Sequence, residues 1–136
     1  MDFNLNEEHL QLRSMVREFA EKRIKPVAQE LDEKESFSHE LTRQMGELGL
    51  LGIYLPEQYG GAGMDYLAYI IAVEEIARID GSQAATLAAH NSLGFGPIYN
   101  NGTEEQKMKS LPQLCTGNAL WSFGLTEPEA GSDSRA

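Results

Sequence analysis

Apolar residues stand three or four positions apart along most of this chain of 136 residues. One such series near the start is Leu12, Val16, Ala20, Ile24, Val27 and Leu31. Because a helix completes one turn every 3.6 residues, this spacing places the apolar side chains on one face. Each helix must then bury that face against another element, so we predict a mainly α fold, a helical bundle.

The first predicted helix runs from Asn6 to Glu33. Asn6 is a suitable N-cap, and Glu7 and Glu8 follow in the first turn, where the helix dipole favours acidic side chains. Pro26 interrupts the helix but leaves the phase of the apolar stripe unchanged. We therefore predict one kinked helix here rather than two separate helices.

Four further helices are predicted from capping residues and glycine stops. The first of them begins at Ser38, ends before Gly49, and carries Leu41, Met45 and Leu48 on its apolar face. The next runs from Asp65, a good N-cap, to Ile79, with Gly81 as the stop. The last two run from Gln83 to Leu93 with Ser82 as the cap, and from a capping box of Thr103 and Gln106 to Cys115 with Gly117 beyond it. The helix after Asp65 is apolar on more than one face, which predicts a central place in the bundle.

Two stretches rich in glycine are predicted to be turns, at residues 59–63 and 94–97. The first, Tyr59-Gly60-Gly61-Ala62-Gly63, invites comparison with a dinucleotide-binding loop. That pattern would need a third glycine at Tyr66 and a strand before the loop. We therefore predict no nucleotide site at this run.

The pattern of residue types changes after Gly117. Residues 119–125 carry Leu, Trp and Phe and predict a short strand leaving the bundle. A lone strand would expose an unpaired edge, so we expect it to open a sheet that continues beyond Ala136, in a longer protein. This divides the chain into a helical domain at 1–118 and the start of a β domain at 119–136.

The composition limits the classes of binding partner and the cellular compartment that we expect. The net charge is −10, which argues against nucleic acid, because phosphate binding needs clustered Lys and Arg. No window approaches 18 apolar residues and the N-terminus lacks a signal peptide, so we expect no membrane span. Cys115 is the one cysteine, predicted to be a buried apolar residue, and its isolation fits a reducing, cytoplasmic location.

Common catalytic arrangements are weak in this sequence. His9, His39 and His90 are isolated from one another, so we predict no metal site. No serine stands in a nucleophile-elbow pattern. Most carboxylates are expected on solvated helix faces, and none is predicted to act as a general base.

The stretch from Phe123 to Asp133, FGLTEPEAGSD, differs from everything before it. Thr126 and Ser132 supply hydroxyls, Pro128 fixes a backbone angle, and Gly131 allows close approach of a ligand. From these residues alone the stretch is either a plain loop or a segment that holds a flavin ring and a pyrophosphate.

The string at 125–133, LTEPEAGSD, resembles the flavin-binding signature of the acyl-CoA dehydrogenase family. Other landmarks follow in the expected order: Leu48-Gly49-Leu50, Pro56-Glu57, Tyr59-Gly60-Gly61, Glu74-Glu75 before Ala77, and Gly102-Thr103 with Gln106-Lys107. Members of that family have an N-terminal helical domain, a middle β domain and a C-terminal helical bundle. The resemblance covers the whole chain and implies the first domain with the opening strand of the second.

The resemblance implies FAD as cofactor and α,β-dehydrogenation of an acyl-CoA thioester as activity. A carboxylate removes the α proton while the β hydride passes to the flavin. Phe123, Leu125 and Thr126 are then expected along the flavin ring, and Gly131 and Ser132 on its ribityl–pyrophosphate side. The catalytic carboxylate is expected in a C-terminal part, so the 136 residues alone should contain no catalytic residue and be inactive.

The resemblance also implies substrate contacts. Ser132 would touch the acyl-CoA, and the fourth helix would line the acyl pocket through Ala85, Thr86 and Ala89. Because these side chains are small, we expect the pocket not to be blocked from this side.

Several alternatives and partners stay open. An acyl-CoA oxidase, a monooxygenase or a DNA-alkylation-response flavoprotein would share the fold, and a non-catalytic helical interaction domain is the rival of another class. The family implies an electron-transfer flavoprotein as acceptor and a homotetramer for the full-length protein.

Overall fold

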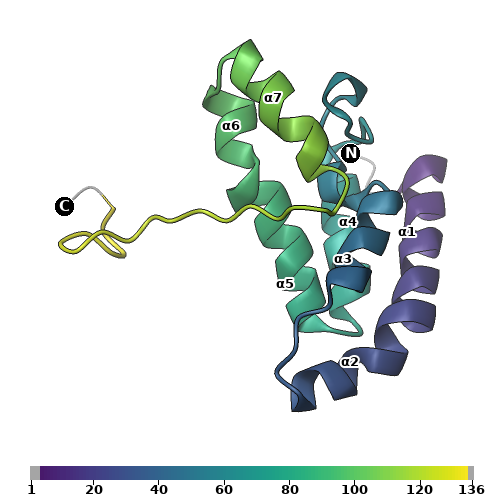
Figure 1. Ribbon diagram of the computed structural model, residues 1–136. Helices are drawn as coiled ribbons and strands as arrows, with labels where there is room; N and C mark the ends of the chain where they lie inside the picture. Colours follow the sequence, from purple (N-terminus) through teal and green to yellow (C-terminus); the bar gives the residue numbers. More distant parts are fainter. Residues whose placement is uncertain (1–3, 135–136) are drawn as a thin grey trace.

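One long helical run opens the fold and bends part-way along (Figure 1). The computed structural model describes residues 4–134. The run consists of α1 at Glu7–Phe19, a π-helical turn η1 at Ala20–Ile24, and α2 at Lys25–Glu33. The Asn6 side chain accepts a hydrogen bond from the backbone of His9 at 2.8 Å, so the predicted cap is confirmed.

The prediction of one kinked helix is also confirmed, and the structure gives the kink two causes. In the π turn the Lys25 N–H bonds to the carbonyl of Ala20, five residues back instead of four. Pro26 follows at once and has no N–H to donate. A wider turn before a proline lets the helix change direction and continue.

The second predicted helix is α3 at His39–Glu47, capped by the Ser38 side chain as expected. Gly49 has a φ of +74°, which stops the helix in the left-handed region that glycine tolerates. Leu41 and Met45 are buried, but Leu48 is 37% exposed, contrary to prediction. Leu48 is the C-cap with non-helical backbone, so its side chain leaves the apolar face.

Two short 3-10 turns, η2 at Leu50–Gly52 and η3 at Glu57–Tyr59, lead to the glycine run. Gly60 and Gly63 both have positive φ, and the predicted turn at 59–63 is confirmed.

Next, α4 spans Tyr66–Ala77 behind the predicted Asp65 cap. It packs between α1 and α5, which confirms its central place, although Ile70 on its outer side is 54% exposed.

The following helix, α5, spans Gly81–Ala89, and two details of its start were predicted wrongly. Asp80, not Ser82, is the cap, because the Asp80 carboxylate accepts from the N–H groups of Ser82 and Gln83. Gly81 is therefore the first residue of α5 and not the stop of α4. A carboxylate can accept several bonds at a helix start, and the Ser82 hydroxyl donates to it as well.

The predicted turn at 94–97 is largely helical. A π turn η4 at His90–Gly94 continues α5, and α6 at Gly96–Asn101 follows directly. Pro97 lies in the first turn of α6, where no backbone N–H donor is required, so it starts a helix instead of preventing one. Last comes α7 at Glu104–Leu114, whose predicted capping box between Thr103 and Gln106 is confirmed.

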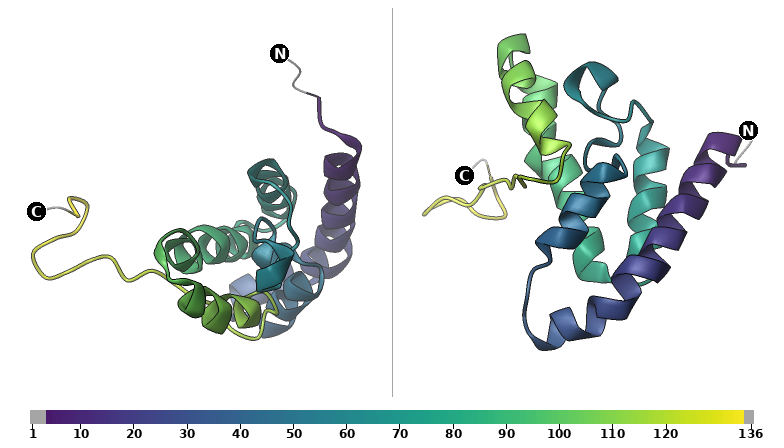
Figure 2. Two further views of the ribbon diagram at one scale, coloured as in Figure 1. Left: turned by 90° about the horizontal axis from the view of Figure 1, so that it is seen from above. Right: turned by 45° about the vertical axis from the view of Figure 1, so that its right-hand side comes forward.

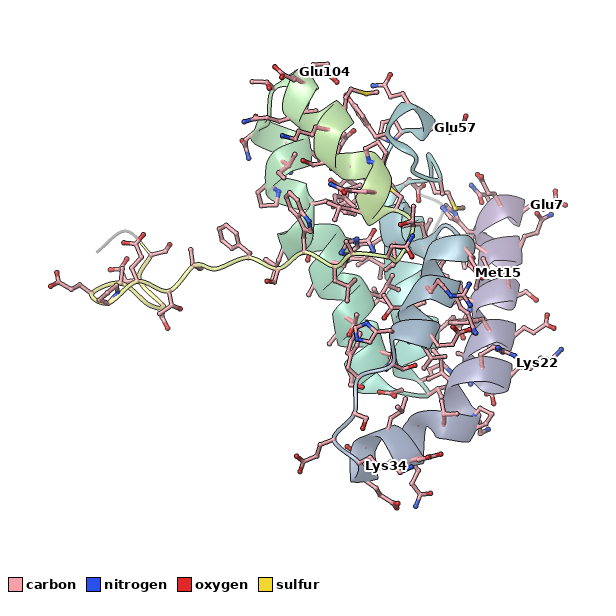
Figure 3. All side chains as sticks on the ribbon, viewed as in Figure 1. Glu7, Met15, Lys22, Lys34, Glu57 and Glu104 are labelled. Atoms are coloured by element: carbon pink, nitrogen blue, oxygen red, sulfur yellow. The ribbon has the colours of Figure 1, made fainter. Side chains whose placement is uncertain are left out.

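Buried apolar side chains form two clusters. The larger one joins α1, α3, η2, α4 and α5. The smaller one consists of Leu55, Tyr59, Phe95, Leu111, Leu114 and Cys115, near the start of the C-terminal segment. Charged side chains line the outside of the first helical run, where Glu7, Lys22 and Lys34 point away from the bundle (Figure 3).

Glu75 is an exception to the expectation that carboxylates are solvated. Its side chain is fully buried and bonded to Arg13 and Arg17 of α1 and to Arg78, the C-cap of its own helix. The Arg17 hydrogen bonds, ahead of those from the other two, lower the pKa of the Glu75 carboxyl to about 2. Four charges thus join α1 to α4 at a point that no sequence pattern had indicated.

The mainly helical fold is confirmed, and the C-terminal segment leaves it as an extended chain (Figure 1). Within residues 4–134 no strand is assigned at 119–125, and the one β-bridge joins Glu127 to Ala130. A strand needs a neighbour to pair with, so the opening strand and the boundary after residue 118 stay predictions.

Candidate functional site

The segment predicted to hold the cofactor lies outside the bundle. Both views of Figure 2 show the last described part of the chain, in yellow, extending away from the helices. Phe123 and Leu125 are 49% and 50% exposed, and Thr126 and Ser132 are exposed as well. The segment therefore presents two large apolar side chains and two hydroxyls to its surroundings.

Its backbone is equally available. Within residues 4–134, the N–H and C=O groups of 122–126 have no hydrogen-bond partner. Glu127 and Ala130 close a tight turn around Pro128 through bonds of 2.8 and 3.3 Å. A Cβ added to Gly131 would meet nothing within 4 Å. Exposed apolar side chains beside unpaired backbone donors fit the needs of a flat, polar-edged ring such as a flavin.

The root of this segment, by which we mean residues 116–121, is by contrast in close contact with the bundle. A Cβ added to Gly46 of α3 would lie 2.3 Å from the carbonyl oxygen of Thr116, so the chain crosses α3 in near contact. Gly117 turns there with a φ of +78°. Further on, the Trp121 N–H lies 3.3 Å from Nδ1 of His90. The contacts of Thr116 with α3 and of Trp121 with His90 thus fix where the segment leaves the bundle.

The predicted substrate residues lie on α5. Ala85 is exposed, whereas Thr86 and Ala89 are half-buried. Thr86 donates its hydroxyl hydrogen bond to the carbonyl of Ser82 and lines a cavity of about 790 Å³, which Ala85 and Ala89 do not line. The bundle carries these residues and the extended segment carries Ser132, so the described chain does not bring the two predicted groups together.

His9 and His39 contact other side chains. His9 Nε2 lies 3.0 and 3.1 Å from the two carboxylate oxygens of Asp65, which ties the start of α1 to the cap of α4. His39 packs edge-on against Phe37. Across residues 4–134 no group of three or more metal-binding side chains gathers, and no helix there is long and apolar enough to cross a membrane.

Cys115 is buried at the end of α7, as predicted. Burial raises the pKa of its thiol from the ordinary 9.0 to about 11. Only the thiolate reacts with alkylating reagents, so we expect the folded protein to resist iodoacetamide at pH 8. Mass spectrometry should show alkylation at pH 8 only after denaturant is added. Rapid labelling of the folded protein would contradict this placement of the thiol.

The sequence matches the family model described as "Acyl-CoA dehydrogenase, N-terminal domain" over residues 6–118. The chain belongs to the acyl-CoA dehydrogenase family. It is 51% identical over its full length to the "Acyl-CoA dehydrogenase, short-chain specific" of Clostridium acetobutylicum, and covers 36% of that protein. The chain therefore spans about a third of the length of this relative.

Solved structures of acyl-CoA dehydrogenases share the fold. The butyryl-CoA dehydrogenase of Megasphaera elsdenii is 44% identical with a TM-score of 0.90, over 98% of this chain and 36% of that one. An acyl-CoA dehydrogenase of Bacillus anthracis, solved in complex with FAD, is 39% identical with a TM-score of 0.89, over 96% of this chain and 22% of that one.

Sequence reasoning missed the residues that hold the root of the segment. His90, Gly94 and Gly46 carry no motif that marks them as neighbours of Thr116 or Trp121. A weak signal was available in the small residues at positions 46 and 94, since a glycine inside a helical pattern often marks close packing.

Proposed function

We propose that this acyl-CoA dehydrogenase chain is the N-terminal part of an FAD-dependent enzyme that dehydrogenates an acyl-CoA thioester between its α and β carbons. The observation that carries the proposal is the segment at 123–132 in a chain of this family: its apolar side chains are exposed, and its backbone groups at 123–126 have no hydrogen-bond partner within residues 4–134. The bound flavin would supply the acceptor for the hydride, which carries both electrons of the oxidation. Residues 1–118 would form the helical domain, and 119–136 would begin the next.

In this proposal each residue of the segment has a separate task. Phe123 and Leu125 would cover the apolar part of the ring, because their side chains are half exposed and have space around them. The Thr126 hydroxyl and the backbone N–H groups at 125–126 would donate hydrogen bonds to its polar edge. Gly131 would let the backbone approach the cofactor's phosphates, with the Ser132 hydroxyl beside it.

The acyl chain would lie against α5. Ala85 and Ala89 have no bulk beyond Cβ, and the Thr86 hydroxyl is already bonded to its own helix, so this face would offer an apolar wall. The proton-abstracting carboxylate would come from another part of the protein. A protein partner, an electron-transfer flavoprotein, would take the electrons, and a cytoplasmic homotetramer is proposed for the full-length protein.

The decisive experiment uses the full-length protein. We expect it to be purified with bound FAD, visible by its absorbance near 450 nm, and to be bleached anaerobically by saturated acyl-CoA esters. Slow reoxidation by air with fast reoxidation by an electron-transfer flavoprotein would identify a dehydrogenase, whereas fast reoxidation by air would identify an oxidase. A colourless protein that no acyl-CoA reduces would refute the proposal.

The wall of α5 can be tested by Ala89→Met in the same protein. We expect kcat/KM for an eight-carbon acyl-CoA to fall by about tenfold, with a much smaller change for a four-carbon ester, because added bulk shortens the pocket. Ala77→Met is the matched control, since Ala77 is an exposed residue of the neighbouring α4. An equal loss for both esters would argue against a place for Ala89 in the pocket, as would turnover of only the shortest esters by the unmutated protein.

A further inference from the structure

His90 links two parts of the chain that are far apart in sequence. Its ring lies in η4 and is fully buried. Nε2 lies 3.0 Å from the carbonyl oxygen of Leu114, at the end of α7. On the other side of the ring, Nδ1 lies 3.3 Å from the backbone N–H of Trp121.

The hydrogen bonds to Leu114 and Trp121 determine which nitrogen of the neutral ring carries the proton, and the backbone of Leu51 also interacts with the ring. A carbonyl can only accept a hydrogen bond and a backbone N–H can only donate one. The proton of the neutral ring must therefore be on Nε2, which leaves Nδ1 as the acceptor for Trp121. Burial lowers the pKa of His90, so the ring stays neutral near pH 7 and Nδ1 keeps its lone pair.

Gly94 completes the contact one helical turn further on. A Cβ at this position would lie only 2.6 Å from the carbonyl oxygen of Trp121. Any side chain here would therefore displace the segment, since the clash is with backbone. Both backbone groups of Trp121 thus rest against η4, while its side chain packs on the smaller apolar cluster.

The position of this contact along the chain matters for the proposed cofactor site. Trp121 stands two residues before Phe123 and four before Leu125. Between Trp121 and Glu127, no backbone group has a hydrogen-bond partner within residues 4–134. The bond from Trp121 to His90 is therefore the last hydrogen bond from the bundle before the segment that would face the flavin.

We propose that His90 is a positioning residue, whose neutral ring ties Trp121 to the end of α7 and so sets the place of residues 123–126 relative to the bundle. Its effect on cofactor binding rests on the proposed function, whereas its hold on the segment does not. His90 would touch neither flavin nor substrate. It would act through the backbone that leads to them.

Two substitutions separate the two hydrogen bonds of the ring. In His90→Asn, the side-chain oxygen can take the place of Nδ1, so the acceptor for Trp121 is kept and the bond to Leu114 is lost. In His90→Gln, the longer side chain can place its NH2 near Nε2, so the bond to Leu114 is kept and the acceptor is lost. Both variants remove the same ring from the same buried place.

The first measurement is hydrogen exchange by mass spectrometry on the full-length protein without FAD. We expect the Trp121 amide, resolved by overlapping peptides within residues 118–126, to exchange about tenfold faster in His90→Gln than in His90→Asn, as one hydrogen bond typically accounts for. Gly94→Ala should give the same rise with the His90 ring intact. The second measurement is the FAD dissociation constant, expected to rise by about tenfold in His90→Gln and Gly94→Ala and about twofold or less in His90→Asn.

The exchange measurements decide whether His90 positions the segment. Equal exchange of the Trp121 amide in the two His90 variants would overturn the positioning role. Loss of the packing of the ring alone would affect both variants equally. If His90→Gln fails to fold, Gly94→Ala with unchanged exchange would overturn it too. If the unmutated protein binds no FAD, the proposed function fails, and the exchange comparison still decides whether His90 holds the segment.

Discussion

Replacing Glu75 with glutamine is expected to lower the free energy of unfolding by about 3 kcal/mol, since charge-assisted bonds to a buried group are lost. The Glu75 side chain is fully buried, with Arg13 Nε at 2.9 Å, Arg17 Nη2 at 2.7 Å and Arg78 Nη1 at 2.9 Å. Glutamine keeps the shape but has one acceptor oxygen and no charge. Chemical denaturation followed by circular dichroism would measure the loss.

Glu74→Gln is the matched control. Glu74 stands next to Glu75 on the same helix but is exposed, so its replacement should change stability by less than about 0.5 kcal/mol. If the two variants lost equal stability, the buried charge cluster would not be what joins α1 to α4.

The same cluster predicts a dependence on pH. The pKa of the Glu75 carboxyl is about 2 in the folded protein, below its ordinary value of 4.5. Above pH 4.5 the carboxyl is ionised in both states, so its full contribution to stability is present. As pH falls from 4.5 towards 2, the unfolded chain takes up the proton first and the contribution is lost. The difference between the unmutated protein and Glu75→Gln should therefore shrink over this range.

Replacing Gly46 with alanine is expected to destabilise the fold by about 2 kcal/mol or more, because inserted atoms in packed surroundings force the backbone apart. The added Cβ would lie 2.3 Å from the Thr116 oxygen and 2.7 Å from the Gly117 nitrogen. Both neighbours are backbone, so no side chain can turn aside. Helix propensity alone predicts the opposite sign, a gain of about 1 kcal/mol. The sign of the change thus separates local from tertiary control.

Gly81→Ala provides the control for this experiment. Gly81 is also helical, at the start of α5, and a Cβ there would meet nothing within 4 Å. We expect this variant to be as stable as the unmutated protein or slightly more stable. Thermal melts of the two variants side by side would measure both changes. A Gly46→Ala protein that melts higher would show that α3 and the crossing chain are not in the described contact.

Gly46 and Gly94 together show how the bundle directs the proposed cofactor segment. At Gly46 the chain passes over α3, and at Gly94 it passes over η4 before it departs. Each crossing requires a residue without a side chain, and His90 adds a hydrogen bond at the second. The place of the segment therefore depends on three residues of the helical domain that need not touch the cofactor.

Much of the fold could be predicted because helix starts and stops are local. The caps at Asn6, Ser38 and Asp65 and the capping box at Thr103 each use groups within three residues, and all four were predicted correctly. Where a neighbouring residue could serve equally well, prediction failed. At α5 the stronger acceptor, Asp80, took the place given to Ser82.

The sequence by itself determined the helices, most of their ends and the family, because these depend on periodicity, capping groups and a contiguous motif. Only the tertiary structure decided that Glu75 and not Glu74 is buried, and that His90 and Gly94 hold Trp121. The partners of Glu75 on α1 lie 58 and 62 residues away, and Trp121 lies 31 residues from His90. Contacts at such separations depend on how the helices pack, and one sequence alone carries no local signal for them.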